Sequence, residues 1–207
     1  MDIERTVQKI AEAPMPTHLG LFHMTVFQAQ SRLEHVALTS GNIRADIPTL
    51  VRLHSECMTG DVFGSARCDC GEQLDASLQI LQREGGVLLY LRQEGRGIGL
   101  VNKIRAYALQ DQGLDTVDAN RALGLPDDMR DYGEAAEMLG ILGIRHIHLL
   151  TNNPAKVEGL ERHGIRVEQR IPLVISPNPQ NVQYLITKQR RMGHQLPELL
   201  IHGQVAS

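Results

Sequence analysis

The chain has 207 residues, of which 42% are hydrophobic and 22% are charged. These are ordinary globular values, so they exclude a disordered chain, a collagen-like repeat and a disulfide-stapled miniprotein, and the length fits one domain over residues 1–207. Twenty-one Lys and Arg against 24 Asp and Glu give a net charge of −3. The chain therefore has no overall positive field to attract nucleic acid or an acidic membrane, although a local cluster of cations could still bind a polyanion.

Three cysteines, an odd number, argue against a disulfide framework. No apolar run reaches the roughly 18 residues of a membrane span, and the first 30 residues lack the pattern of a signal peptide. We therefore expect a cytoplasmic protein that binds neither nucleic acid nor membrane. In that reducing compartment, cysteines are better candidates for metal binding or catalysis than for disulfides.

The first half of the chain reads as strands that precede a helix. Residues 1–19 contain two prolines and no sustained period, so we expect a lead-in that is poorly ordered over residues 1–13. Residues 21–27 and 35–39 predict an antiparallel pair of strands, and a further strand is expected over residues 46–53. A helical period then starts at Gly71 and ends at Gly85.

The second half alternates strands and helices. A buried strand at 87–91 is followed by a glycine-rich turn at 94–99 and by a helix with Val101, Ile104 and Ala108 on one face. Later in the chain the patterns predict helices at 116–123, 135–139, 154–163 and 181–192, and strands at 146–150 and 167–175. Strands joined by crossover helices predict an α/β fold of three layers, with a mixed β-sheet flanked by helices. Residues 197–207 are expected to be a poorly ordered tail.

All three cysteines fall within one short segment, as Cys57-x10-Cys68-x-Cys70. Zinc binds thiolates tetrahedrally, and three protein ligands with no evident fourth describe an open, catalytic site that keeps a water. Two alternatives remain at this point. The cysteines could be small buried thiols, or His54 could be a fourth ligand that closes a structural site.

Two turns have the features of phosphate-binding loops. Residues 94–97 and residues 151–156 each lead from a strand into a helix, whose free backbone N–H groups can face an anion. Each turn could equally be a plain glycine turn or a helix cap. Four cations, Arg52, Arg96, Arg130 and Lys156, could together bind a triphosphate, whereas residues 127–131 read on composition alone as a solvated loop.

The order of these segments closely resembles the GTP cyclohydrolase II family. The resemblance rests on residues 52–61, 67–71, 92–100, 102–111, 115–120 and 150–156, and it covers about residues 14–196. It implies that GTP is converted to 2,5-diamino-6-ribosylamino-4(3H)-pyrimidinone 5′-phosphate, formate and diphosphate, the first step of riboflavin synthesis. It also implies zinc, magnesium with the triphosphate, and a homodimer.

The resemblance assigns roles to particular positions. Cys57, Cys68 and Cys70 match the zinc ligands, Asp128 a proton acceptor, Arg130 a nucleophile toward the α-phosphate, and Tyr107 a tyrosine that lines the site. The positions that match GTP contacts are Arg52, Leu53, His54, Ser55, Glu56, Gln73, Glu94, Gly95, Arg96, Thr116, Thr151 and Lys156.

Two of these roles can be checked against elementary chemistry. A carboxylate such as Glu94 can accept hydrogen bonds from guanine N1–H and the exocyclic amine, a pairing that adenine cannot offer. A guanidinium is a poor nucleophile because its pKa exceeds about 12. We therefore expect Arg130 to be essential without assigning its role.

Other functions remain open on the sequence. A zinc nucleoside deaminase would carry a Pro-Cys-x-x-Cys pair, which this sequence lacks. A zinc-stabilised GTP-sensing module, or an altered paralogue that stalls before it loses formate or diphosphate, would show the same motifs.

Overall fold

The structure is a computed structural model that describes residues 6–44 and 46–196. Its sheet has seven strands in the order β1-β2-β3-β5-β4-β6-β7. The pairings among β1, β2, β3 and β5 are antiparallel, and those among β5, β4, β6 and β7 are parallel. The strands are β1 Val7–Thr17, β2 Gly20–Ala29, β3 Glu34–Ser40, β4 Thr49–Ser55, β5 Gly86–Leu91, β6 His146–Leu150 and β7 Arg166–Ile171.

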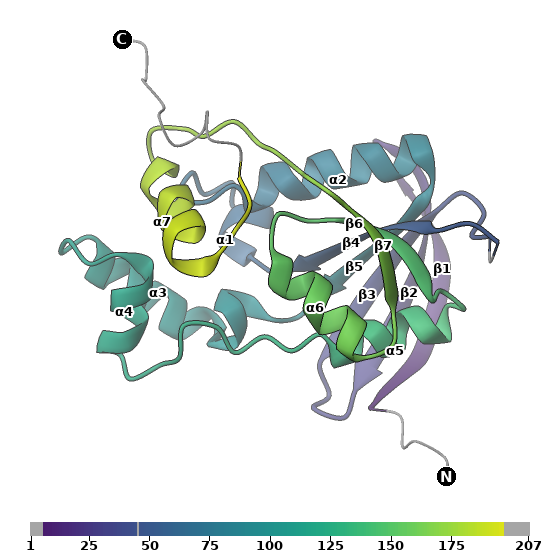
Figure 1. Ribbon diagram of the computed structural model, residues 1–207, viewed down its shortest axis with the longest axis horizontal. Coiled ribbons are helices and arrows are strands. Elements are labelled where there is room, and N and C mark those ends of the chain that lie inside the picture. Colours follow the sequence, from purple (N-terminus) through teal and green to yellow (C-terminus); the bar gives the residue numbers. More distant parts are fainter. Residues whose placement is uncertain (1–5, 45, 197–207) are drawn as a thin grey trace.

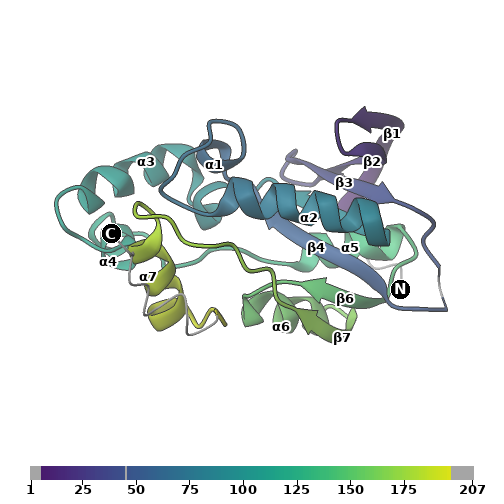
Figure 2. The same ribbon diagram turned by 90° about the horizontal axis from the view of Figure 1, so that it is seen from above.

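Helices cover both faces of this sheet. α2 lies along one face, whereas α5 and α6 lie on the other, and α3, α4 and α7 gather beyond one end of the sheet (Figures 1 and 2). This arrangement confirms the predicted three-layer α/β fold with a mixed sheet. The helices are α1 Met58–Asp61, α2 Cys70–Glu84, the 3-10 turn η1 Glu94–Gly97, α3 Gly99–Gln110, α4 Thr116–Ala122, α5 Gly133–Ile141, α6 Pro154–Arg162 and α7 Val182–Met192.

Alternation along β4 separates the core from the polar side of the sheet. Val51 and Leu53 are fully buried in the main hydrophobic core, together with Met138 and Leu139 of α5. Because successive side chains of a strand point to opposite faces, the residues between them belong to the other face. These are Arg52 and His54, which are also buried. The strand thus brings two polar side chains to the face that α2 covers.

The predicted antiparallel pair is confirmed as β2 and β3, but the prediction of a lead-in before it is wrong over residues 7–17. β1 pairs with β2 alone and only Val7 in it is buried, so it lacks the alternation that reveals a strand. Its prolines are tolerated because an edge strand has one unpaired side. β7 also ends at Ile171, earlier than expected. The expectations for residues 1–5 and 197–207 lie outside the described residues.

The apolar face predicted for α3 is exposed rather than packed in the core. Val101 is 65% exposed and Ile104 is 48% exposed, whereas Lys103 and Ala106 are buried. The helix borders a polar cavity rather than the hydrophobic core, so Val101 and Ile104 face outward. Among the described residues, no helix is both long and apolar enough to cross a membrane.

Candidate active site

A cavity opens where the parallel strands end. β4 leads into residues 55–57, β5 into η1, and β6 into residues 151–153, and all three segments line the cavity. In a sheet of this kind, ligands bind at the carboxyl ends of the parallel strands. The predicted site residues among its lining are Arg52, His54, Ser55, Glu56, Cys57, Cys68, Cys70, Gln73, Glu94, Gly95, Arg96, Tyr107, Thr116, Arg130, Thr151 and Lys156.

Two predicted site residues do not line this cavity. The Leu53 side chain lies in the hydrophobic core, on the opposite face of β4 from Arg52 and His54. Its backbone carbonyl accepts a hydrogen bond from Lys156 Nζ at 2.6 Å, so its contribution here is through the main chain. Asp128 is set behind Arg130 and contacts its guanidinium.

The three cysteines form a cluster with the dimensions of a metal site. Their sulfur atoms all lie within 4.8 Å of one another, and Cys57 Sγ is 3.7 Å from Cys68 Sγ. Zinc–sulfur bonds of about 2.3 Å at tetrahedral angles place neighbouring sulfurs about 3.8 Å apart. The donor set and its spacing therefore fit zinc.

The ionisation of these thiols also fits a cation. Hydrogen bonds from Cys68 and Cys70, together with the Lys103 ammonium, hold the pKa of Cys57 far below its usual range. The pKa of Cys68 is raised to about 11 and that of Cys70 is raised well above its usual range, because the Cys57 thiolate is their neighbour and burial disfavours their charge. A bound dication would be needed to ionise all three.

His54 is not placed as a fourth ligand. Its Nε2 atom lies 3.0 Å from both carboxylate oxygens of Asp61, and the cysteine cluster does not include it. Asp61 Oδ2 also accepts hydrogen bonds from Tyr90 Oη at 2.8 Å and from the Cys57 backbone N–H at 2.9 Å. Burial lowers the pKa of His54, so its ring is neutral at pH 7. These contacts favour the open, three-ligand site.

Lys103 and Glu94 border the cysteine cluster. Lys103 Nζ donates to Cys57 Sγ at 3.1 Å and to Glu94 Oε1 at 2.8 Å. Glu94 also accepts from the backbone N–H groups of Met58 and Gly95, each at 2.7 Å. A carboxylate has about four acceptor positions, so Glu94 could take two guanine donors only by giving up a contact shown here.

The glycine-rich turn is bent by two residues in left-handed backbone conformation. Gly95 has φ 62° and Arg96 has φ 63°, and such a conformation is uncommon for a residue that carries a side chain. Arg96 reaches Thr116 Oγ1 with its Nη2 atom at 3.4 Å, and its carbonyl accepts from the Met129 backbone N–H at 3.0 Å. The turn thereby joins α4 and the 127–130 loop to the cavity.

The turn after β6 contains both a helix cap and cavity residues. Asn153 caps α6 through a hydrogen bond from the Ala155 backbone N–H, and Pro154 occupies the first turn. Thr151 and Lys156 nevertheless line the cavity. Burial and the nearby charges of Arg52 and Arg130 hold the pKa of Lys156 well below its usual range, so an anion placed beside it would favour its charged form.

Arg130 and Asp128 form a two-point ion pair. Arg130 donates from Nε at 2.9 Å to Asp128 Oδ1 and from Nη2 at 2.5 Å to Oδ2. Burial disfavours the charge on Arg130, but the Asp128 carboxylate outweighs it and raises the pKa of the guanidinium. The same contact outweighs burial at Asp128 and lowers the pKa of that carboxyl. Both groups are therefore charged at neutral pH.

Tyr107 lies on α3 close to two cations. Arg67 Cζ is 5.1 Å and Lys103 Nζ is 5.9 Å from the centre of its ring. Burial raises the pKa of its hydroxyl to about 12, so the group is protonated at neutral pH and can donate a hydrogen bond.

Sequence reasoning missed several residues that border the cavity or support it. Lys103 follows Glu94 by nine residues and lies on the polar face of α3. Sequence reasoning could have found it by taking this polar face as the one that borders the site. Asp61 and Asp69 lie close to the cysteines, but acidic residues are common in proteins and gave no signal. Tyr184, Lys188 and His194 were also missed, because they lie in or after the last described helix and far along the chain from the motifs.

Comparisons with known proteins point to one family. The family model for GTP cyclohydrolase II matches residues 8–172. Curated proteins named riboflavin biosynthesis protein RibBA are similar over 93% of this chain: that of Bacillus cytotoxicus is 52% identical with 49% of its length covered, and that of Nocardia farcinica is 55% identical with 47% covered. The chain thus spans about half the length of the curated relatives it matches.

One solved structure, RibBX from A. baumannii, a two-domain 3,4-dihydroxy-2-butanone 4-phosphate synthase, overlaps with 84% of this chain and 42% of its own. Its TM-score is 0.47 at 17% identity. The sequence matches over most of the chain show where it belongs: it is a member of the GTP cyclohydrolase II family.

Proposed function

We propose that this protein hydrolyses GTP to 2,5-diamino-6-ribosylamino-4(3H)-pyrimidinone 5′-phosphate, formate and diphosphate, as a zinc-dependent enzyme of riboflavin synthesis. The observation that carries the proposal is that three cysteines with zinc-site spacing and a set of buried cations share one cavity. Family membership supports the same reaction. We further propose that magnesium accompanies the triphosphate and that the enzyme is a cytoplasmic homodimer.

The cysteine end of the cavity suits the guanine base of GTP, and the end with the buried cations suits the triphosphate. Zinc held by Cys57, Cys68 and Cys70 would supply a Lewis acid for hydrolysis of the C–N bonds at C8 of guanine. Lys103 offsets negative charge beside these ligands through its contacts with Cys57 and Glu94. Tyr107, which is protonated at neutral pH, can donate a hydrogen bond to substrate at this end.

The cations would bind the triphosphate. Arg52, Arg96, Arg130 and Lys156 all line the cavity, and Arg52 Nε is buried with no hydrogen-bond partner among the described residues. An anion there would supply the missing acceptor. The charged Arg130, fixed by Asp128, would stabilise negative charge as diphosphate leaves.

The exposed apolar residues bear on the proposed homodimer. Phe63 is 74% exposed, and Val62 and Val101 are each more than 60% exposed. Apolar side chains of this size on a surface are common at interfaces between subunits. Sedimentation equilibrium would test the proposal, and a monomer at micromolar concentration would contradict it.

The reaction is tested by incubating purified, zinc-loaded protein with GTP and magnesium, with formate, diphosphate and the diaminopyrimidine product measured separately. A Cys57→Ser variant is the control. We expect equimolar release of all three products and loss of formate in the variant. Diphosphate without formate would instead indicate an altered paralogue, and tight GTP binding without turnover would indicate a sensing module.

A further inference from the structure

The last described helix, α7, borders the cavity although no role has been assigned to it. The family match ends at residue 172, and α7 spans Val182–Met192. Tyr184, Leu185 and Lys188 of this helix are among the residues that line the cavity. In Figures 1 and 2, α7 lies beside α4, beyond the end of the sheet.

α7 and the residues just after it are attached to three separate parts of the site. The attachments reach the cysteine loop, the start of α4 next to Thr116, and the turn after β6 next to Thr151. They are the ion pair of Lys188 with Asp69, those of Arg191 with Asp115 and Asp118, and the hydrogen bond from the Gln195 backbone N–H to the Asn152 carbonyl.

The first attachment continues into the nucleotide site as a chain of hydrogen bonds. Lys188 Nζ lies 3.0 Å from Asp69 Oδ1, and the two side chains are 12% and 3% exposed. Asp69 Oδ2 accepts from Gln73 Nε2 at 2.5 Å, and Gln73 Oε1 accepts from Arg52 Nη2 at 2.6 Å. These hydrogen bonds therefore link the Lys188 ammonium of α7 to the Arg52 guanidinium of β4.

The order of donors along this chain fixes the Gln73 amide. An ionised carboxylate only accepts hydrogen bonds, so the NH₂ group of Gln73 must face Asp69. Its oxygen is then left to face Arg52. Lys188 is the full positive charge that partners the buried Asp69 carboxylate. Without it, Asp69 would be an uncompensated buried charge, free to turn toward Arg52.

We propose that Lys188 is a positioning residue of the nucleotide site, which holds the Arg52 guanidinium in place through Asp69 and Gln73. The proposal rests on the proposed function, because it takes Arg52 to bind GTP. It adds α7 to the site, since this helix then keeps the cation that meets the triphosphate in its binding position.

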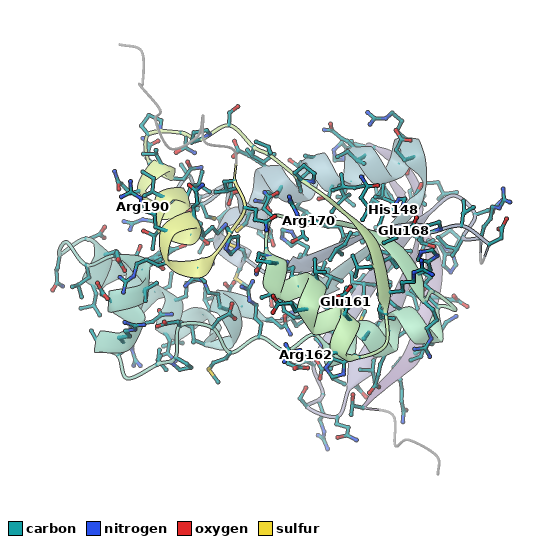
Figure 3. All side chains as sticks on the ribbon, in the orientation of Figure 1. His148, Glu161, Arg162, Glu168, Arg170 and Arg190 are labelled. Carbon is teal, nitrogen blue, oxygen red and sulfur yellow. The ribbon has the colours of Figure 1, made fainter. Side chains whose placement is uncertain are left out.

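The test compares four variants, with Arg190→Met as the control. They are Lys188→Met, Lys188→Arg, Asp69→Asn, and the double variant that combines Lys188→Met with Asp69→Asn. Arg190 is exposed on the same helix and is labelled in Figure 3. The readouts are the Kd for GTP by calorimetry, KM and kcat for formate release, bound zinc, and circular dichroism for folding.

We expect Lys188→Met to raise Kd and KM about tenfold, with a smaller change in kcat and no loss of zinc, because a misplaced binding group weakens binding. Lys188→Arg keeps the charge and should restore KM, and Arg190→Met should match the wild type. Asp69→Asn and the double variant should share one KM, since Lys188 has nothing left to position once the Asp69 charge is removed.

Three results would overturn the proposal. Lys188→Met could fold and keep the wild-type KM, or Lys188→Arg could show the same raised KM as Lys188→Met. The double variant could also have a higher KM than Asp69→Asn. If Lys188→Met does not fold, the comparison of Asp69→Asn with the double variant decides, because the double variant buries no unpaired charge. Failure of the wild type to bind GTP would defeat the proposed function instead.

Discussion

Arg130 and Asp128 show how single side chains in this cavity keep their charge. The Arg130 side chain is 11% exposed and that of Asp128 is 31% exposed, and each stabilises the ionised form of the other through two hydrogen bonds. A nucleophilic arginine would have to lose its proton, and the raised pKa of Arg130 opposes that loss. At the residue scale, the geometry therefore favours Arg130 as a fixed cation that binds phosphate oxygens.

Replacement of Arg130 by lysine should lower kcat/KM for diphosphate release about 100-fold, which corresponds to about 2.7 kcal/mol. Lysine keeps the charge, but it cannot contact Asp128 and a phosphate with a planar set of donors. The control is Arg162→Lys on α6, an exposed arginine labelled in Figure 3. Near-normal diphosphate release by Arg130→Lys would contradict both a nucleophile and a two-point clamp.

Lys156 leads to a prediction about pH. In the free protein, burial and the charges of Arg52 and Arg130 hold its pKa well below the usual range, which favours loss of its proton. A bound triphosphate would raise that pKa, and binding should therefore take up protons. Calorimetry at pH about 8, where phosphate groups with a pKa of about 6 are already ionised, should show this uptake as a dependence on buffer ionisation enthalpy.

The matched variant for this experiment is Lys156→Met, which has no ammonium to protonate. It should bind GTP more weakly and without the proton uptake. Uptake of equal size in this variant would show that the protons go to another group.

At the element scale, α3 turns its polar side to the cavity. Lys103 contacts Cys57 of the cysteine cluster, and its ammonium lies near the Tyr107 ring. Val101 and Ile104 face outward. The helix thus places the Lys103 ammonium and the Tyr107 hydroxyl beside the cysteine end of the cavity, and it leaves Val101 and Ile104 exposed.

Removal of the Lys103 charge should weaken the metal site. In Lys103→Met, the Glu94 carboxylate and the Cys57 thiolate lose their shared cation, so the cysteine loop and its neighbours should rearrange. Loss of such outer contacts typically costs 10- to 100-fold in metal affinity, and we expect about tenfold here, measured by competition with a zinc chelator. Arg105→Met, an exposed cation on the same helix, should leave zinc affinity unchanged, and an equal loss in both variants would refute the role of Lys103.

The same elements show what could be predicted from the sequence. β5 and α2 follow from a short apolar run and from leucines at helical spacing, because these elements bury a strand or one face of a helix in the core. β1 could not be predicted, since only Val7 of that edge strand is buried. The inward face of α3 could not be predicted, because apolar spacing does not say which side of a helix borders a polar cavity.

At the scale of the whole molecule, the cavity joins segments from residue 52 to beyond residue 184. Motifs predicted the cysteines, the two turns and most of the cations, since each has a recognisable local pattern. The pairing of Lys188 with Asp69 spans 119 positions, and no local pattern reports a contact of that range. Leu53 shows the reverse limit: a motif position can act through its backbone while its side chain packs in the core.

The most direct test of the account is a zinc titration of metal-free protein in the presence of GTP and magnesium, with formate release measured at each step. The three-thiolate site predicts that the rate rises in proportion to added zinc and saturates at one zinc per chain, and that Cys57→Ser stays inactive throughout. Full formate release before zinc is added, or restored activity in Cys57→Ser at equimolar zinc, would contradict it.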